Sequence, residues 1–188
     1  MPLHAPASDF SVRIAEGAAA FVCEGHPLTV HSLASEIGVE PERLRALYPS
    51  DADLVFAAVQ GGFARLAGAI SAVPTGVGDA RRLAELGRAY IRFAFANRPL
   101  FLLMFDPAHG PRRPDSAKDG GYLSALEIVA DAVWMPSESE PARIAMLQVW
   151  SMVHGYAMLA LAGALPEDAR GDRVIDAMID ASVSRIAA

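Results

Sequence analysis

The sequence predicts an all-α protein, in which an N-terminal head of three helices is joined to a larger helical body. Three observations support this fold class. The 188 residues are 53% apolar and 20% charged, which is enough apolar surface for a buried core. Alanine and leucine are abundant and β-branched or aromatic runs are scarce, which favours helices over strands. Apolar residues also recur at the 3.6-residue spacing of amphipathic helices.

The predicted helices are separated by residues that end or begin helices. Gly25 and Pro27 end the first helix, and Ser50 with Asp53 matches a capping box at the start of the fourth. Pro99 suits the first turn of the sixth helix. The predicted ranges are 9–24, 29–36, 40–47, 51–72, 79–97, 99–105, 118–134, 140–162 and 172–187.

Three short helices precede several longer ones, and this order predicts two domains. We expect residues 1–54 to form a helix-turn-helix head and residues 55–188 to form the body, so the boundary lies within the long fourth helix. Residues 106–121 are rich in proline and glycine and are predicted to form a long loop.

One predicted helix is apolar enough to suggest a membrane span. Residues 144–165 carry no formal charge and are long enough to cross a bilayer. Because this stretch contains Gln148 and His154, and the other helices are amphipathic, we interpret it as a helix buried between two layers of protein. Cys23 is the single cysteine and the N-terminus does not resemble a signal peptide, so we expect a cytoplasmic protein.

The strongest motif spans residues 30–47. Ala34 is small where two steeply crossing helices would touch, and four residues later Gly38 can adopt the positive φ that the turn requires. The apolar residues predicted to face one core are Leu33, Ile37, Val39, Leu44 and Leu47. The pattern indicates a helix-turn-helix, and an accidental helical hairpin is the alternative.

Head and body both resemble the tetracycline-repressor (TetR) family. In the head, the resemblance is carried in order and spacing by residues 21–25, 28–30, 33–34, 38–39, 44, 48–50 and 54. In the body, residues 90–105 and a Trp-x-x-x-His-Gly signature at Trp150, His154 and Gly155 are similar to one TetR subgroup. The similarity covers about residues 10–165. It implies a DNA-binding head, an effector-binding body and a homodimer.

The resemblance implies that the second helix of the motif lies in the major groove of operator DNA. An arginine there can bind guanine through two hydrogen bonds, and nearby hydroxyl groups can donate to phosphates. The candidate DNA contacts are Thr29, Ser32, Glu42, Arg43, Arg45 and Tyr48. The predicted head carries three arginines against eight carboxylates, a net charge of −5, and this acidity weakens its attraction to phosphates.

The body contains more large, adaptable apolar side chains than a tight core requires. Methionine and aromatic walls suit a small hydrophobic or aromatic effector, and His154 could fix its orientation, as could Tyr90, Arg92 or Asn97. The candidate effector contacts are Phe93, Phe101, Met104, Phe105, Trp150, His154 and Met158. The alternative is that these side chains simply fill the core.

The last two helices are predicted to pair with those of a second copy. The helix at 172–187 has a wide apolar stripe, and the absence of charge at 144–165 fits burial on two sides. The candidate interface residues are Val149, Met152, Val153, Gly155, Ile175, Met178 and Ile179. Contacts within one chain are the alternative.

The sequence contains little that indicates catalysis. Gly61-Gly62 and Gly120-Gly121 lack the lysine and strand of a phosphate-binding loop, and the histidines lack the helical spacing of a metal site. We therefore expect no enzyme, no cofactor and no metal. The leading hypothesis is an effector-responsive transcriptional regulator, a repressor by resemblance. The alternatives are a TetR-like dimer with a degenerate acidic head that binds a hydrophobic molecule or lipid, and a non-binding partner of another TetR-like chain.

Overall fold

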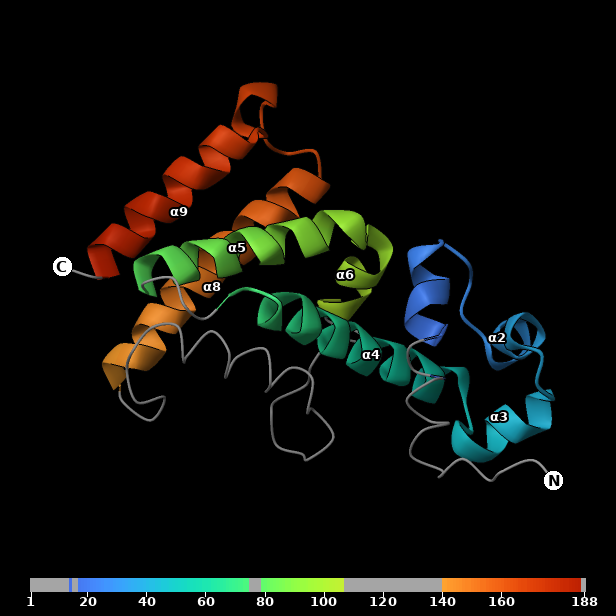
Figure 1. Cartoon of the computed structure of the whole chain (residues 1–188). Helices are drawn as coiled ribbons and strands as arrows, with labels where there is room; N and C mark the ends of the chain where they lie inside the picture. The colour runs from blue at the N-terminus through green and yellow to red at the C-terminus, as the bar shows by residue number, and fades with distance from the viewer. Residues whose placement is uncertain (1–13, 15–16, 75–78, 107–139, 187–188) are drawn as a thin grey trace. The chain divides into compact units, whose positions relative to one another are not determined.

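The computed structural model describes Ile14 and residues 17–74, 79–106 and 140–186, and Figure 1 shows the elements that they form. Every regular element in this part of the chain is a helix, which confirms the predicted all-α fold class. The predicted helix at 118–134 and nearly all of the predicted loop at 106–121 lie outside the described residues.

The helices have almost the bounds that the sequence predicts. Residues 17–23 are helical, and the elements that follow are α2 (Val30–Ile37), α3 (Pro41–Leu47), α4 (Asp51–Ser71), α5 (Asp79–Ala96), α6 (Arg98–Met104), α8 (Glu140–Leu161), the 3₁₀ turn η1 (Glu167–Ala169) and α9 (Asp172–Ile186). The start of α4 confirms the predicted capping box. The Ser50 N–H donates to the Asp53 carboxylate at 2.9 Å, and the Asp53 N–H donates to the Ser50 hydroxyl at 3.2 Å.

The chain folds as two compact units. The first contains the chain up to Arg65 and returns at Asn97, and the second contains Leu66–Ala96 and the segment with α8 and α9. Helix α4 therefore belongs to both units, and its first fifteen residues, 51–65, pack with the head. Short helix α6 also belongs to the first unit.

The first unit has an apolar core built from its short helices and the start of α4. The fully buried members of this core are Ile14, Ala18, Val30, Leu33, Ala34, Leu44, Leu54 and Ala58. Helix α6 adds Phe101 and Met104, both completely buried. Gly62 allows α4 and α6 to approach closely, because a Cβ at this position would lie 2.7 Å from the Met104 sulfur.

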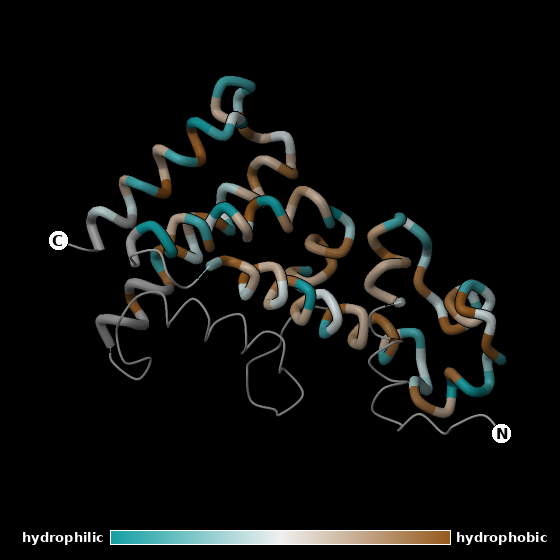
Figure 2. The backbone as a smooth tube through the Cα atoms, viewed as in Figure 1, coloured by the Kyte–Doolittle hydropathy of each residue, from teal (hydrophilic) through white to brown (hydrophobic). Residues whose placement is uncertain are grey.

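The second unit consists of α5, α8 and α9 packed on one another. Gly87 of α5 lies at their meeting point, where an added Cβ would be 3.1 Å from Ile179 and 3.2 Å from Val153. Hydrophilic and hydrophobic segments alternate along α9, as expected for a helix with one buried face (Figure 2).

Among the described residues one helix is long and apolar enough to raise the membrane question, and it is α4. Its most apolar window is 56% buried inside the protein, which is typical of a core helix. The apolar stretch predicted at 144–165 forms most of α8, whose inner face packs in the second unit. For α8, the structure thus supports burial within the protein on one of its faces.

Candidate functional site

The helix-turn-helix has the predicted turn. Gly38 follows α2 with φ of +67°, a left-handed conformation that glycine adopts without a steric penalty, and its N–H donates to the Ala34 carbonyl. Ala34 is completely buried where α2 meets α3. Both predictions for this turn are confirmed.

The predicted core of the motif is only partly correct. Leu33 and Leu44 are completely buried and Val39 packs against them. Ile37 and Leu47 are 36% and 41% exposed, so their assignment to the core was wrong. Each lies on the buried face of its helix but is the last residue of that helix, where the packed pair of helices ends and leaves the side chain partly uncovered.

Helix α3 presents the predicted recognition side chains. Glu42, Arg43 and Arg45 are all exposed, and Arg45 lies in the last turn, where a positive charge interacts favourably with the helix dipole. Tyr48 caps the end of α3 and is half-buried against the core, and this burial raises the pKa of its hydroxyl group. The predicted DNA contacts on α3 are therefore accessible, whereas Tyr48 also has a packing role.

The two hydroxyl groups predicted to contact phosphates are engaged in capping α2. Thr29 accepts from the Ser32 N–H at 3.0 Å, and the Thr29 N–H donates to the Ser32 oxygen at 3.0 Å. The Ser32 hydroxyl also lies 2.8 Å from the Pro27 carbonyl, to which it can donate. Both side chains are thus part of a capping box, which stabilises the start of α2.

Asp51 links the starts of two helices. It lies in the first turn of α4, and its carboxylate accepts a hydrogen bond of 2.8 Å from the N–H of Val30, the first residue of α2. A carboxylate is stabilised at a helix N-terminus by the dipole and by unpaired N–H groups. The same features bind phosphate groups in other proteins, so Asp51 occupies a position that an anion could take.

The second unit contains a polar cluster around the predicted effector contacts. The Tyr90 hydroxyl lies 2.9 Å from Nδ1 of His154, and the Trp150 indole N–H donates to the Tyr90 oxygen at 3.4 Å. Burial lowers the pKa of His154, which favours the neutral imidazole. A neutral imidazole carries one N–H donor and one nitrogen acceptor, so the His154 ring can either accept from or donate to the Tyr90 oxygen.

The other predicted effector contacts divide between the two units. Phe101, Met104 and Phe105 lie in the first unit, where the Phe105 ring is 4.9 Å from the Phe101 ring and 5.5 Å from the Phe63 ring. Phe93 is buried in α5 and Met158 is half-buried in α8. The complete burial of Phe101 and Met104 matches the alternative in which they fill the core. Their role in effector binding stays a prediction.

Four of the seven predicted interface residues face the interior of their own unit. Val149, Val153, Ile175 and Ile179 are buried among α5, α8 and α9, so the structure does not leave them available to a second copy. Ile175 and Ile179, from the apolar stripe of α9, are buried in this packing within one chain. Met152, Gly155 and Met178 are only partly buried.

Helix α8 has a separate apolar face that is open. Ile144, Leu147 and Leu159 are each about half exposed, and their spacing places them on the side opposite Val149 and Val153. Ser151 and Gly155 lie on the same stripe. Sequence periodicity detected an apolar helix here but did not distinguish its two faces.

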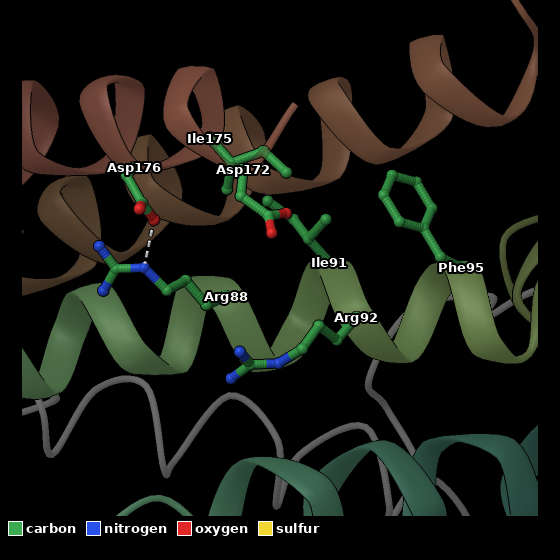
Figure 3. A pocket seen from close by; sticks show the side chains of 7 residues that line it. All are labelled: Arg88, Ile91, Arg92, Phe95, Asp172, Ile175 and Asp176. Atoms are coloured by element: carbon green, nitrogen blue, oxygen red, sulfur yellow. Dashed lines mark hydrogen bonds and ion pairs between the residues drawn. The ribbon is translucent and has the colours of Figure 1, made fainter. Parts of the chain in front are cut away.

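A pocket of about 230 Å³ lies between α5 and α9 of the second unit (Figure 3). It is lined by Arg88, Ile91, Arg92, Phe95, Asp172, Ile175 and Asp176. The sequence suggested Arg92 as a polar contact and Phe95 as one of the large apolar side chains that could line a cavity, but it did not predict the other five as ligand contacts. The α5 residues recur three or four positions apart, and Asp172 and Asp176 of α9 are four positions apart, so each set lies on one face of its helix. Neither helix alone indicates that these two faces enclose a pocket.

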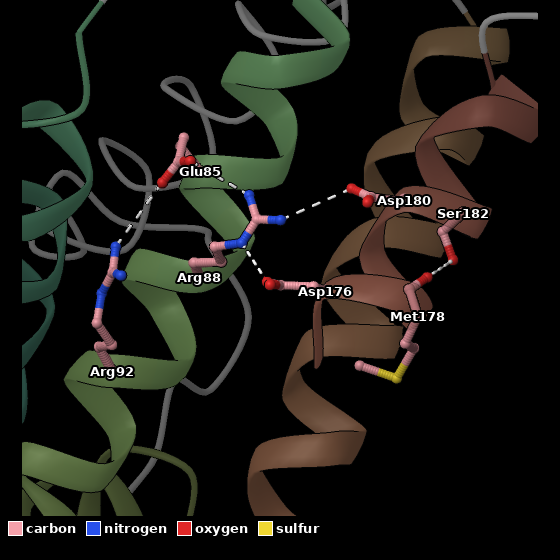
Figure 4. Close-up of polar contacts among 7 residues, drawn as sticks. All are labelled: Glu85, Arg88, Arg92, Asp176, Met178, Asp180 and Ser182. Carbon is pink, nitrogen blue, oxygen red and sulfur yellow. Dashed lines mark hydrogen bonds and ion pairs between the residues drawn. The ribbon is translucent and has the colours of Figure 1, made fainter. Parts of the chain in front are cut away.

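Ion pairs connect the two helices beside this pocket (Figure 4). Arg88 donates from Nε to Asp176 and lies 3.2 Å from a Glu85 oxygen and 3.7 Å from an Asp180 oxygen. These carboxylates raise the pKa of Arg88, with the hydrogen bond to Asp176 as the largest cause. Arg92 is mostly exposed and lies 4.0 Å from Glu85.

A helix-turn-helix hairpin joined to a helical body is typical of a class of two-part regulatory proteins. Comparisons with known proteins place the chain in this class. The tetracyclin repressor-like C-terminal domain matches residues 83–182, more than half of the chain. The chain belongs to this family, the TetR-like proteins. A comparison with curated proteins found no match.

Two solved structures have the same fold along nearly the whole chain. The crystal structure of SCO4313, a presumed regulatory protein, has a TM-score of 0.68 at 17% identity and covers 97% of this chain and 98% of its own. A protein of unknown function from Rhodococcus sp. RHA1 has a TM-score of 0.65 at 25% identity, with coverage of 98% and 95%. The similarity to the first shows the fold alone.

Proposed function

We propose that this protein is an effector-responsive, cytoplasmic transcriptional repressor that binds operator DNA as a homodimer. The observation that carries the proposal is the helix-turn-helix, in which the turn at Gly38 leaves α3 with Arg43 and Arg45 exposed. An arginine in the major groove can bind guanine through two hydrogen bonds, so Arg45 is the main candidate for sequence recognition. Family membership supports a regulator rather than an enzyme.

We assign the homodimer interface to the open face of α8. Ile144, Leu147 and Leu159 form an apolar stripe that water would otherwise contact, and Gly155 on the same stripe permits a close helix approach. A two-fold pairing of this face buries it in both copies. A homodimer carries two heads, and a helix-turn-helix protein requires two heads to contact successive major grooves of one duplex.

We assign effector recognition to the cluster of Tyr90, Trp150 and His154. Its hydrogen bonds hold polar groups in a largely apolar layer, which is the usual composition of a site for a small hydrophobic or aromatic molecule. An effector that binds one arrangement of the dimer more tightly shifts the population toward it and changes the spacing of the heads. The effector thereby controls occupancy of the operator.

The proposal is tested by fluorescence anisotropy with labelled DNA from the region upstream of the gene. We expect tighter binding to this duplex than to a scrambled one, and weakening with salt because phosphate contacts release counterions. Arg45→Ala should abolish the preference between the two duplexes. Arg81→Ala is a matched control, because Arg81 is exposed on α5 in the other unit. Equal binding to both duplexes by the unchanged protein would overturn operator recognition.

A second candidate function is favoured by the acidity of the head and by the use of its polar side chains in capping α2. Asp51 occupies the N-terminus of α2, Thr29 and Ser32 are used in capping, and residues 17–54 carry two arginines against six carboxylates, a net charge of −4. This arrangement fits a TetR-like dimer that binds a hydrophobic molecule or lipid without contacting DNA. Absence of DNA binding at low salt, together with a lipid in the purified protein, would favour this function over the first.

A further inference from the structure

The pocket between α5 and α9 is separate from the polar cluster of the proposed effector site. Arg88, Ile91 and Phe95 line the pocket from one face of α5, whereas Tyr90 and Phe93 project from the opposite face. Asp172 and Asp176 close the pocket from the first turns of α9. Figure 3 shows the pocket-lining side chains of α5 and α9 between the two helices, with Arg88 extending to Asp176.

The charges beside the pocket do not balance. They comprise two guanidinium groups, of Arg88 and Arg92, and four carboxylates, of Glu85, Asp172, Asp176 and Asp180. Arg88 is already surrounded by three of these carboxylates, and Arg92 extends along α5 toward Glu85 (Figure 4). These six groups together carry a net charge of −2, which disfavours an anionic ligand.

Part of this negative charge lies on the Asp172 carboxylate, which faces the pocket. It makes no ion pair with any described residue, and Figure 3 shows it extending from α9 above Ile91, toward the side on which Phe95 lies. A carboxylate beside an apolar surface is a favourable partner for a ligand ammonium group.

The remaining wall is apolar and aromatic. Ile91 and Ile175 are almost completely buried and form the floor, whereas the Phe95 ring is 41% exposed. The face of an aromatic ring attracts a cation, and its surface also covers an apolar group. A volume of about 230 Å³ is below the usual range for drug-sized ligands, so the occupant is a small molecule with at most one ring.

We propose that this pocket binds a small organic cation. Its ammonium group lies between the Asp172 carboxylate and the Phe95 ring, and its apolar part rests on Ile91 and Ile175. The proposal does not depend on DNA binding by the head, so either can fail without the other.

The test is isothermal titration calorimetry of the full chain with four compounds of similar shape and different charge. Phenethylammonium is the cation, phenethyl alcohol its neutral counterpart, phenylacetate the anion and phenylalanine the zwitterion. We expect the cation to bind about tenfold more tightly than the alcohol, as for a charge-assisted hydrogen bond, and to weaken with added salt. Equal affinity for the alcohol, or tighter binding of phenylacetate or phenylalanine, would overturn the proposal.

Three variants locate the binding. Asp172→Asn should weaken phenethylammonium about tenfold, and Phe95→Leu about two- to fivefold, because leucine retains apolar contact without the ring face. Asp168→Asn removes the same charge from the neighbouring exposed η1 turn and should leave binding unchanged. Circular dichroism verifies the helical fold of each variant. Identical affinities for the Asp172 and Asp168 variants would place the cation elsewhere and refute the site.

Discussion

Replacing Asp51 should change the stability of the head and its DNA affinity in opposite directions. The Asp51 carboxylate accepts from the N–H of Val30, a residue that is completely buried, so its removal leaves a backbone donor without its partner. Because Asp51 itself is exposed, water can partly replace it. Asp51→Ala should therefore lower the free energy of unfolding by about 1 kcal/mol, near the middle of the range for lost helix caps.

Asp51→Asn separates the charge from the hydrogen bond. The amide oxygen can still accept from Val30, so only the interaction with the helix dipole is lost, about 0.5 kcal/mol. A phosphate approaching the start of α2 no longer meets a negative charge, which at low salt is worth about 1 kcal/mol, or about fivefold in DNA affinity. Urea unfolding measures the first effect and fluorescence anisotropy the second.

Glu36→Gln is the matched control, because Glu36 is exposed at the other end of α2 and caps no helix. It removes the same charge from the head, so it reports the general electrostatic effect alone. Equal gains in DNA affinity for Asp51→Asn and Glu36→Gln would show that the position of the charge at the N-terminus of α2 has no effect on phosphate binding. If Asp51→Ala is as stable as the unchanged protein, the contact with Val30 is not stabilising.

Three further predictions follow from packing and burial. Gly62→Ala should cost about 1–3 kcal/mol, since its Cβ would lie 2.7 Å from a buried sulfur, whereas Gly68→Ala on the same helix meets nothing within 4 Å and should stabilise by about 0.5–1 kcal/mol in urea unfolding. Burial lowers the pKa of His154, so below pH 6.5 the unfolded chain binds a proton that the folded chain does not, and the free energy of unfolding should fall as the pH drops. His154→Gln should flatten this part of the profile of stability against pH. An unchanged slope would exclude His154 as its cause. Leu159→Arg should give monomers in sedimentation experiments, whereas Leu102→Arg, at an exposed leucine of the other unit, should not.

The sequence predicted the elements whose structure depends on near neighbours. The capping box at Ser50 and the positive φ of Gly38 involve residues only three or four positions apart, and both were correctly predicted. Helix bounds follow from the same local signals. These parts of the fold could therefore be derived without knowledge of tertiary contacts.

The sequence was less successful in predicting which partner, a helix of the same chain or a second copy, packs on a given apolar face. The apolar stripe of α9 was assigned to a second copy, but Ile175 and Ile179 are buried within the same chain, and Gly87 of α5 leaves room for Ile179. An apolar pattern shows that a face is buried without showing the partner. The α5–α9 pocket could not be predicted for the same reason, since Arg88 and Asp176 are 88 positions apart.

The acidic head has a physical explanation in these contacts. The carboxylates of Asp51 and Asp53 are placed at helix starts, where N–H groups and the dipole stabilise negative charge. Each therefore stabilises the fold of the head while it raises the electrostatic cost of approaching a phosphate. In the proposed operator complex, the exposed arginines of α3 would discriminate between DNA sequences through base contacts rather than through general attraction. Such a head should have weak non-specific affinity, and replacing its capping carboxylates should increase DNA affinity more than specificity.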